Sequence, residues 1–195
     1  MGRLHVRSSL RRPSFAGLAL ALALTAAPAG AAEVAGARFD DRVTVDGQTL
    51  VLNGTGVRSK FFIKVYAAGL YLPAAARDGA RVLAADQPRR TVLHFLYGVD
   101  EDQMCDAWDD ALEANTPNAS ADVAQKFATL CSWMEDVQDG ERMVFTYVPG
   151  TGTTVEVKGE AKGTIPGKPF ADALWAAWIG EKPATKDLRA GLLGG

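Results

Sequence analysis

Histidine and cysteine are scarce in this chain, which has two residues of each among its 195. Cys105 and Cys131 stand too far apart for a C-x-x-C redox motif. His94 lies inside an expected strand, with no cysteine or carboxylate at the spacing of metal ligands. We therefore predict neither a metal site nor a cofactor, and we interpret His94 as a sheet or core residue.

Signatures of covalent and nucleotide chemistry are missing as well. No serine, cysteine or threonine stands in the sequence context of a known nucleophile. Gly54-x-Gly56 lacks the third glycine and the following helix of a dinucleotide-binding loop. The acidic clusters at 100–102 and 109–110 are typical of helix N-termini and exposed faces. These absences leave covalent and nucleotide chemistry without support in the sequence.

The first 32 residues differ from the rest of the chain. An apolar run over residues 15–27 precedes the small residues at 28–31 and follows a basic head made of Arg3, Arg7, Arg11 and Arg12. A basic head, a short apolar middle and an A-x-A end form a secretory signal peptide. The apolar run is too short to span a bilayer comfortably, so we favour a signal over a membrane anchor.

Cleavage is expected after Ala31 or Ala32, which leaves residues 33–195 as a single domain in the periplasm without a stable membrane anchor. The pair Arg11-Arg12 keeps the twin-arginine route open beside the general secretory route. Removal of the four arginines lowers the basic residues from 21 to 17 against 23 acidic ones, so the net charge becomes −6. An acidic protein of this kind is a poor partner for nucleic acid.

The two cysteines fall in segments that resemble a helical hairpin. Residues 100–115 and 121–137 are the expected helices, and Asn118 in the turn between them is equally far from each cysteine. Antiparallel helices folded about this turn would bring the two thiols to the same height, where a disulfide is geometrically allowed. The alternative is two buried thiols that act as small apolar side chains, and spacing does not decide between them.

Strand-like and helix-like segments alternate in blocks along the rest of the chain. We expect strands at 43–45, 50–52, 61–72, 91–97, 142–148, 153–157 and 161–165, and further helices at 74–85, 170–179 and 185–193. Strand hairpins around a helical insertion indicate the α+β class, with an antiparallel sheet and helices packed on one face.

The segment 58–67 carries cations inside an apolar stretch. If it is one strand, its odd positions form an apolar face and its even positions form a face with Arg58, Lys60, Phe62, Lys64 and Tyr66. If the odd face packs into the helix-covered core, the even face lies outward or in a cleft. A cleft with an arginine head suits a carboxylate with an apolar tail. The alternative is a solvent-exposed sheet face, on which the lysine stems cover the aromatic rings and the charged ends lie in water. The alternation of side chains alone favours this alternative.

Several motifs in this order resemble the chalcone isomerase-like family, and more narrowly its bacterial exported branch. They are NGTGVR at 53–58, KVYAAGLYL at 64–72, VPGTGT at 148–153, IPG at 165–167, WIGEKP at 178–183, DL at 187–188 and LLGG at 192–195. The resemblance covers nearly all of the chain after the signal. It implies an open-faced β-sandwich, in which a large antiparallel sheet carries a helical layer on one side.

The resemblance also bears on activity. Plant members cyclise a chalcone to a flavanone, whereas other members lack that activity and some bind fatty acids. Arg58 matches the plant catalytic arginine in the pattern G-x-G-x-R, but Tyr66 stands where the plant strand has a threonine. Ala177 and Trp178 replace the threonine and methionine that precede Ile-Gly in plant enzymes. Flavanone cyclisation is therefore not expected here.

Three functions remain open from the sequence. The preferred hypothesis is binding of a fatty acid or similar amphipathic anion, with Arg58 on the head group, Lys60 or Lys64 assisting, and Phe62, Tyr66 and Trp178 along the tail. The second is an isomerase or intramolecular lyase for a phenolic substrate, which would use Arg58 and Tyr66. The third is a periplasmic interaction protein that binds its partner through the open sheet face.

Overall fold

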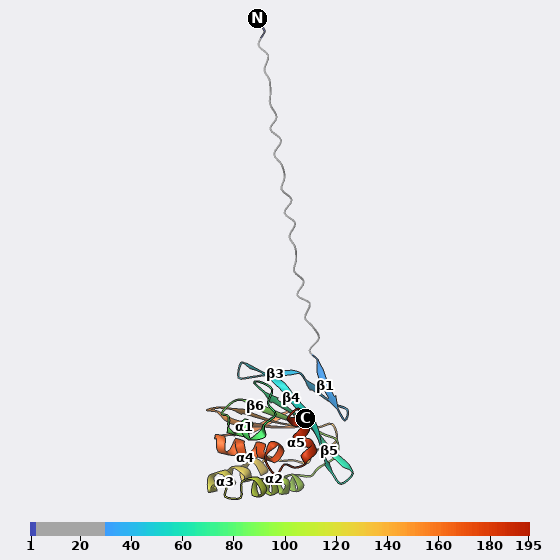
Figure 1. Ribbon diagram of the computed structural model, residues 1–195, viewed down its shortest axis with the longest axis vertical. Helices are drawn as coiled ribbons and strands as arrows, with labels where there is room; N and C mark the ends of the chain where they lie inside the picture. Colours follow the sequence, from blue (N-terminus) through green and yellow to red (C-terminus); the bar gives the residue numbers. More distant parts are fainter. Residues whose placement is uncertain (3–29) are drawn as a thin grey trace.

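The computed structural model describes Met1, Gly2 and residues 30–195, so the expected signal peptide at 1–32 lies almost entirely outside the described residues. A seven-stranded antiparallel sheet forms the centre (Figure 1). Its strands, which neighbour one another in chain order, are β3 (Arg42–Val45), β4 (Gln48–Lys60), β5 (Ile63–Leu72), β6 (Arg89–Phe95), β7 (Arg142–Val148), β8 (Gly152–Val157) and β9 (Glu160–Ile165). A separate hairpin of β1 (Ala31–Val34) and β2 (Ala37–Asp40) precedes it.

The helices cover one face of this sheet. They are α1 (Gly79–Ala84), α2 (Glu101–Asn115), α3 (Ala121–Cys131), α4 (Lys168–Ile179) and α5 (Lys186–Leu192). Figure 1 shows α4 between the sheet and the α2–α3 pair. This place explains why α4 is apolar almost all round, with nine buried residues. The α+β prediction of an antiparallel sheet with helices on one face is confirmed, and no described helix is long and apolar enough to cross a membrane.

The hairpin of α2 and α3 has local causes at its ends. The side chains of Asp100 and Ser120 accept hydrogen bonds from the backbone N–H groups of the first turns, which starts both helices where the sequence predicted. The expected helix at 121–137 was too long, because α3 ends at Cys131 and Val137 instead pairs with Val99 as an isolated β-bridge. Cys131 is joined to Cys105 by a disulfide, with Cα atoms 5.3 Å apart.

The segment 58–66 is not one strand. A turn at residues 61–62 separates β4 from β5, and Arg58 pairs across the hairpin with Tyr66. From Tyr66 onward the even positions of β5 face the helix-covered core and Ala67 faces the opposite side. The odd positions of this segment therefore do not form one face toward the helices, because the turn and a register irregularity after Arg58 reset the alternation.

The sheet face opposite the helices is partly covered. The β1–β2 hairpin, which the sequence did not predict, packs Phe39 over Ala67 and Gly69. A Cβ atom on Gly69 would stand 2.6 Å from Phe39 Cδ1, so the ring needs a glycine beneath it. Farther along this face a polar row crosses four strands, formed by Arg90, Thr146, Thr154 and Thr164. The open face is thus apolar only beneath its short covering strands.

Candidate functional site

A cavity of about 270 Å³ lies between the sheet and the helical layer. Strands β5, β6 and β7 form one wall, α2 forms the facing wall, and α4 with residues 182–184 closes the side. Its polar lining residues Gln103, Asp110 and Lys182 are exposed, whereas Leu93 and Phe95 are buried. The cavity therefore has a polar end toward solvent and an apolar end inside the protein.

The side chains of α2 that face the cavity are small, and this leaves the space open. Ala107, Ala111 and Ala114 recur at a spacing of three or four residues and so share one face of the helix. Trp108 stands at the inner end, with its ring centroid 5.7 Å from that of Trp178. Edge-to-face contacts are a preferred packing of aromatic rings, so packed rings close the inner end of the cavity.

Three polar groups meet at one side of the cavity. The Arg58 guanidinium carbon lies 5.7 Å from the centroid of the Tyr66 ring, since the two residues are cross-strand partners in β4 and β5. Trp178 Nε1 donates a hydrogen bond to Tyr66 Oη at 3.1 Å. Arg58 forms no ion pair with any carboxylate in residues 30–195. The site thus holds an uncompensated cation beside a buried phenol.

The electrostatics of Tyr66 follow from this geometry. Burial raises the pKa of the Tyr66 phenol, and the nearby Arg58 charge and the Trp178 hydrogen bond oppose the rise only in part. The phenol is therefore neutral at physiological pH and keeps its proton. Its oxygen accepts from Trp178, and its own O–H donates to no partner within residues 30–195, so the O–H can donate to a ligand. The arrangement offers an oxyanion two donors, the guanidinium and the phenol.

A family model described as chalcone isomerase-like matches residues 31–194 of the chain. The chain belongs to the chalcone isomerase-like family. Among solved structures, this chalcone isomerase-like protein is similar to the crystal structure of a fatty-acid binding protein of Arabidopsis thaliana, with a TM-score of 0.66 and 18% sequence identity. The alignment covers 84% of this chain and 96% of the plant chain. No curated protein sequence matches this one significantly.

Half of the expected ligand-binding residues lie at the cavity. Arg58, Tyr66 and Trp178 line it. Lys60, Phe62 and Lys64 do not, and our assignment of these three to the site is corrected by the structure, which places them at the exposed end of the β4–β5 hairpin. The reason is the turn at 61–62, which carries these side chains away from the cavity. The error came from treating 58–66 as a continuous strand.

Several lining residues were missed from the sequence. Leu93 and Phe95 are two residues apart on β6 and point to the same side of the sheet. Met143 on β7 is the cross-strand partner of Leu93, so all three face the cavity. Their alternation was a usable signal once the side of the sheet was known. Trp108 packs on Phe145 in the core and also lines the cavity. Which core residues border an empty space is a property of packing, and no local pattern encodes it.

Metal-ligating side chains in the described part of the chain do not form a second site. Residues 1–2 and 30–195 contain no group of three or more histidine, cysteine, aspartate or glutamate side chains placed to hold a metal. His94 lies on the sheet, away from the cavity, where its Nδ1 accepts a hydrogen bond from Arg142 Nε at 3.2 Å. Burial and the Arg142 charge both lower the pKa of His94. The cavity headed by Arg58 is therefore the place to look for function.

Proposed function

We propose that this chalcone isomerase-like protein binds a fatty acid or a similar amphipathic anion, without chemical turnover, in the cavity headed by Arg58. The observation that carries the proposal is an uncompensated guanidinium next to a free phenol O–H at the side of an apolar cavity. A carboxylate would accept two parallel hydrogen bonds from Arg58 and one from Tyr66. The plant structural neighbour, which shares the fold, is named as a fatty-acid binding protein.

The size and lining of the cavity support a ligand with one apolar chain. Its volume of about 270 Å³ lies just below the usual range for ligand pockets, roughly 300–1,000 Å³. Such a space suits a single acyl chain better than the two rings of a chalcone. Each methylene buried against Leu93, Phe95 and Met104 would contribute about 0.8 kcal/mol. Apolar burial then supplies most of the affinity, and Arg58 supplies orientation.

The same residues argue against catalysis. Ala177 lines the cavity at the position where the plant enzymes have a threonine. The hydroxyl that would polarise the substrate there is therefore missing. The phenol of Tyr66 keeps its proton at neutral pH and cannot act as a base there. An isomerase using Arg58 and Tyr66 remains the alternative. Chalcone turnover followed by absorbance, if lost in Arg58→Ala, would overturn the non-catalytic proposal.

The binding test compares Arg58 with a cation that lies outside the cavity. In a displacement assay with a fluorescent fatty acid, Arg58→Ala is expected to weaken binding about 10- to 100-fold, because a hydrogen bond to a charged group contributes about 1.5–3 kcal/mol. Lys60→Ala, two residues along the same strand, should bind like the unchanged protein. The methyl ester of the same acid should bind both proteins alike, since it presents no charge to Arg58.

Two results would contradict this proposal. One is an Arg58→Ala protein with unchanged affinity for the acid, which would place the head group elsewhere. The other is a protein that carries no fatty acid when examined by native mass spectrometry after gentle purification and takes none up on addition. A loss of affinity in Lys60→Ala equal to that in Arg58→Ala would mean that only general surface charge attracts the ligand.

We also propose that the protein belongs to the exported bacterial branch of the family and acts in the periplasm after removal of residues 1–32. The basic and apolar pattern of these residues supports export. The Cys105–Cys131 disulfide supports an oxidising compartment. N-terminal sequencing of protein from a periplasmic fraction should begin at Ala32 or Glu33. An uncleaved chain found only in the cytosol would contradict the proposal.

A further inference from the structure

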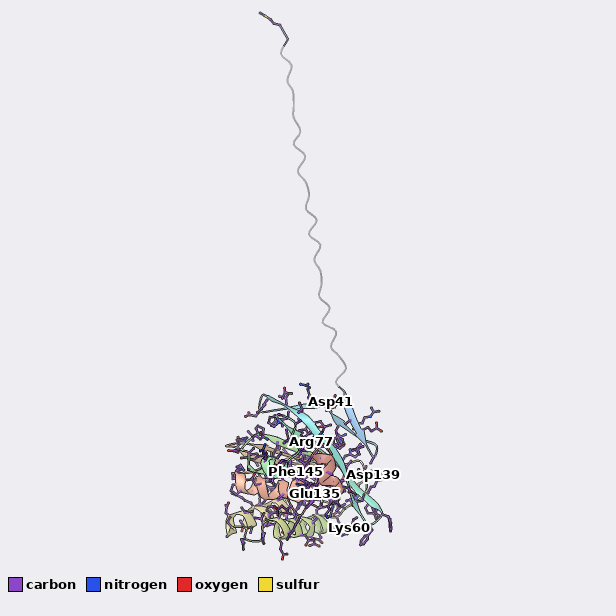
Figure 2. All side chains as sticks on the ribbon, in the orientation of Figure 1. Asp41, Lys60, Arg77, Glu135, Asp139 and Phe145 are labelled. Carbon is purple, nitrogen blue, oxygen red and sulfur yellow. A yellow bond between two sulfur atoms is a disulfide. The ribbon has the colours of Figure 1, made fainter. Side chains whose placement is uncertain are left out.

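The tip of the β4–β5 hairpin, residues 60–64, exposes three consecutive large apolar side chains. Phe61 is 89% exposed, Phe62 103% and Ile63 45%. Lys60 and Lys64 flank them and are exposed too. Figure 1 shows the hairpin projecting from the edge of the molecule, and Figure 2 labels Lys60 at this projecting end. Two adjacent aromatic rings in water, with lysines on both sides, are unusual for a surface that contacts nothing.

The backbone of the tip is strained to hold these rings. Phe61 has a φ of +56° at the first position of a two-residue turn, a conformation for which hairpins normally use glycine. A phenylalanine there is an outlier, and a glycine or asparagine would relax the turn. The rings gain no packing against the rest of the protein in return. Strain kept without a structural gain points to a contact made outside the chain.

The charge of this part of the chain is opposite to that of the whole. The tip and the end of β4 before it, residues 58–64, contain Arg58, Lys60 and Lys64 and no aspartate or glutamate, although the full chain has a net charge of −2. A cationic end on an acidic protein is attracted to anionic surfaces in one orientation only. The order of the side chains also sets which end of the hairpin would meet such a surface first. The aromatic rings are at the apex, and the lysines follow directly behind them.

We propose that the tip at residues 60–64 docks on the surface of an anionic lipid bilayer. Phe61 and Phe62 enter the boundary between head groups and acyl chains, where aromatic side chains are favoured. Lys60 and Lys64 then lie at the level of the lipid phosphates and are attracted by the negative surface potential. An apolar apex with a lysine on each side favours a lipid surface, because a bilayer offers an apolar interior and a layer of phosphates at the depths of these two kinds of side chain.

Docking in this orientation also bears on the cavity, and this step depends on the proposed function. Arg58 precedes Lys60 by two residues on β4, a rise of roughly 7 Å along a strand. A docked tip therefore brings the Arg58 side of the cavity close to the head groups. An acyl chain could pass from the bilayer to the cavity without crossing much water.

The test is co-sedimentation with vesicles of phosphatidylglycerol and phosphatidylethanolamine, with phosphatidylcholine vesicles as the neutral comparison. The unchanged protein and all variants carry the same N-terminus, so differences in vesicle binding between them come from the tip alone. The unchanged protein should sediment with the anionic vesicles and be released by salt. Phe61→Gly with Phe62→Ser should reduce the bound fraction at least 10-fold, and Lys60→Gln with Lys64→Gln should remove the salt-dependent part.

Matched variants keep the outcome interpretable. Lys186→Gln removes an exposed lysine on α5, outside the β4–β5 tip, and should not change vesicle binding. Phe61→Gly relaxes the turn, so its unfolding midpoint should be unchanged or higher while vesicle binding falls. Fatty-acid binding measured without vesicles should be unchanged in the tip variants, which separates failure of docking from failure of the proposed function.

Three results would overturn the docking proposal. The first is an unchanged protein that stays in solution with anionic vesicles, and the second is equal sedimentation of the unchanged protein and the tip variants. The third is a stable dimer in vesicle-free solution that Phe61→Gly with Phe62→Ser dissociates. That result would assign the tip to a second copy of the chain instead of a lipid surface.

Discussion

Asp172→Ala is expected to lower the free energy of unfolding by about 3 kcal/mol, because it leaves a buried cation without its partner. Arg89 is completely buried, and its Nη2 donates to Asp172 Oδ1 at 2.6 Å. Its guanidinium carbon also lies 5.0 Å from the ring centroids of Tyr147 and Trp175. Burial lowers the pKa of Arg89 and the Asp172 hydrogen bond opposes this, so the carboxylate is what makes the buried charge tolerable.

The expected loss is at the lower end of the range for buried pairs, because the Asp172 side chain is 31% exposed and partly screened by water. Urea unfolding followed by tryptophan fluorescence measures it. Lys168 is the matched control, since its Nζ contacts the other Asp172 oxygen at 2.5 Å from a half-buried position one turn away, whereas Arg89 is completely buried. Lys168→Ala should lose less than about 1 kcal/mol. Equal losses for the two variants would show that burial of Arg89 is not the cause.

Trp178→Ala is expected to lower the free energy of unfolding by about 3–5 kcal/mol, the usual range for deleting a buried aromatic side chain. Trp178 is 1% exposed and packs against several rings, with centroids 5.7 Å away at Trp108, 5.5 Å at Phe145 and 6.0 Å at Trp175. Its loss also leaves Tyr66 without the hydrogen bond that orients the phenol. The cavity beside it would become larger.

Trp178→Phe separates the two roles of this residue. It keeps most of the ring volume and removes the Nε1 donor, so we expect a loss of about 1–2 kcal/mol. Thermal and urea unfolding with and without a saturating fatty acid measure both effects. Ligand that fills the enlarged space should return part of the stability of Trp178→Ala, since binding to the native state alone stabilises it. A Trp178→Ala loss under 1 kcal/mol would mean that the aromatic cluster closes over the space.

Strand prediction succeeded where side chains alternate between clear turn residues. Residues 142–148 form β7 as expected, and 153–157 fall within β8, with glycines bounding each segment. It failed at residues 60–63, because Lys60, Phe61, Phe62 and Ile63 contain no glycine, proline, asparagine or aspartate to announce a turn. The turn forms because the cross-strand pairing of β4 and β5 beyond it outweighs the strain at Phe61. Missing that turn put Lys60, Phe62 and Lys64 at the site.

The sequence by itself determined the class of fold, most of the elements and the candidacy of Arg58. Alternation, helix caps and turn residues are local, and the motif that contains Arg58 is contiguous. Only the tertiary structure decided which face of β5 meets the helices, and that Trp178, 112 residues further along the chain, donates to Tyr66 beside Arg58. Strand register and the packing of α4 on the sheet set these contacts. They depend on side chains far apart in the chain, which no local pattern records.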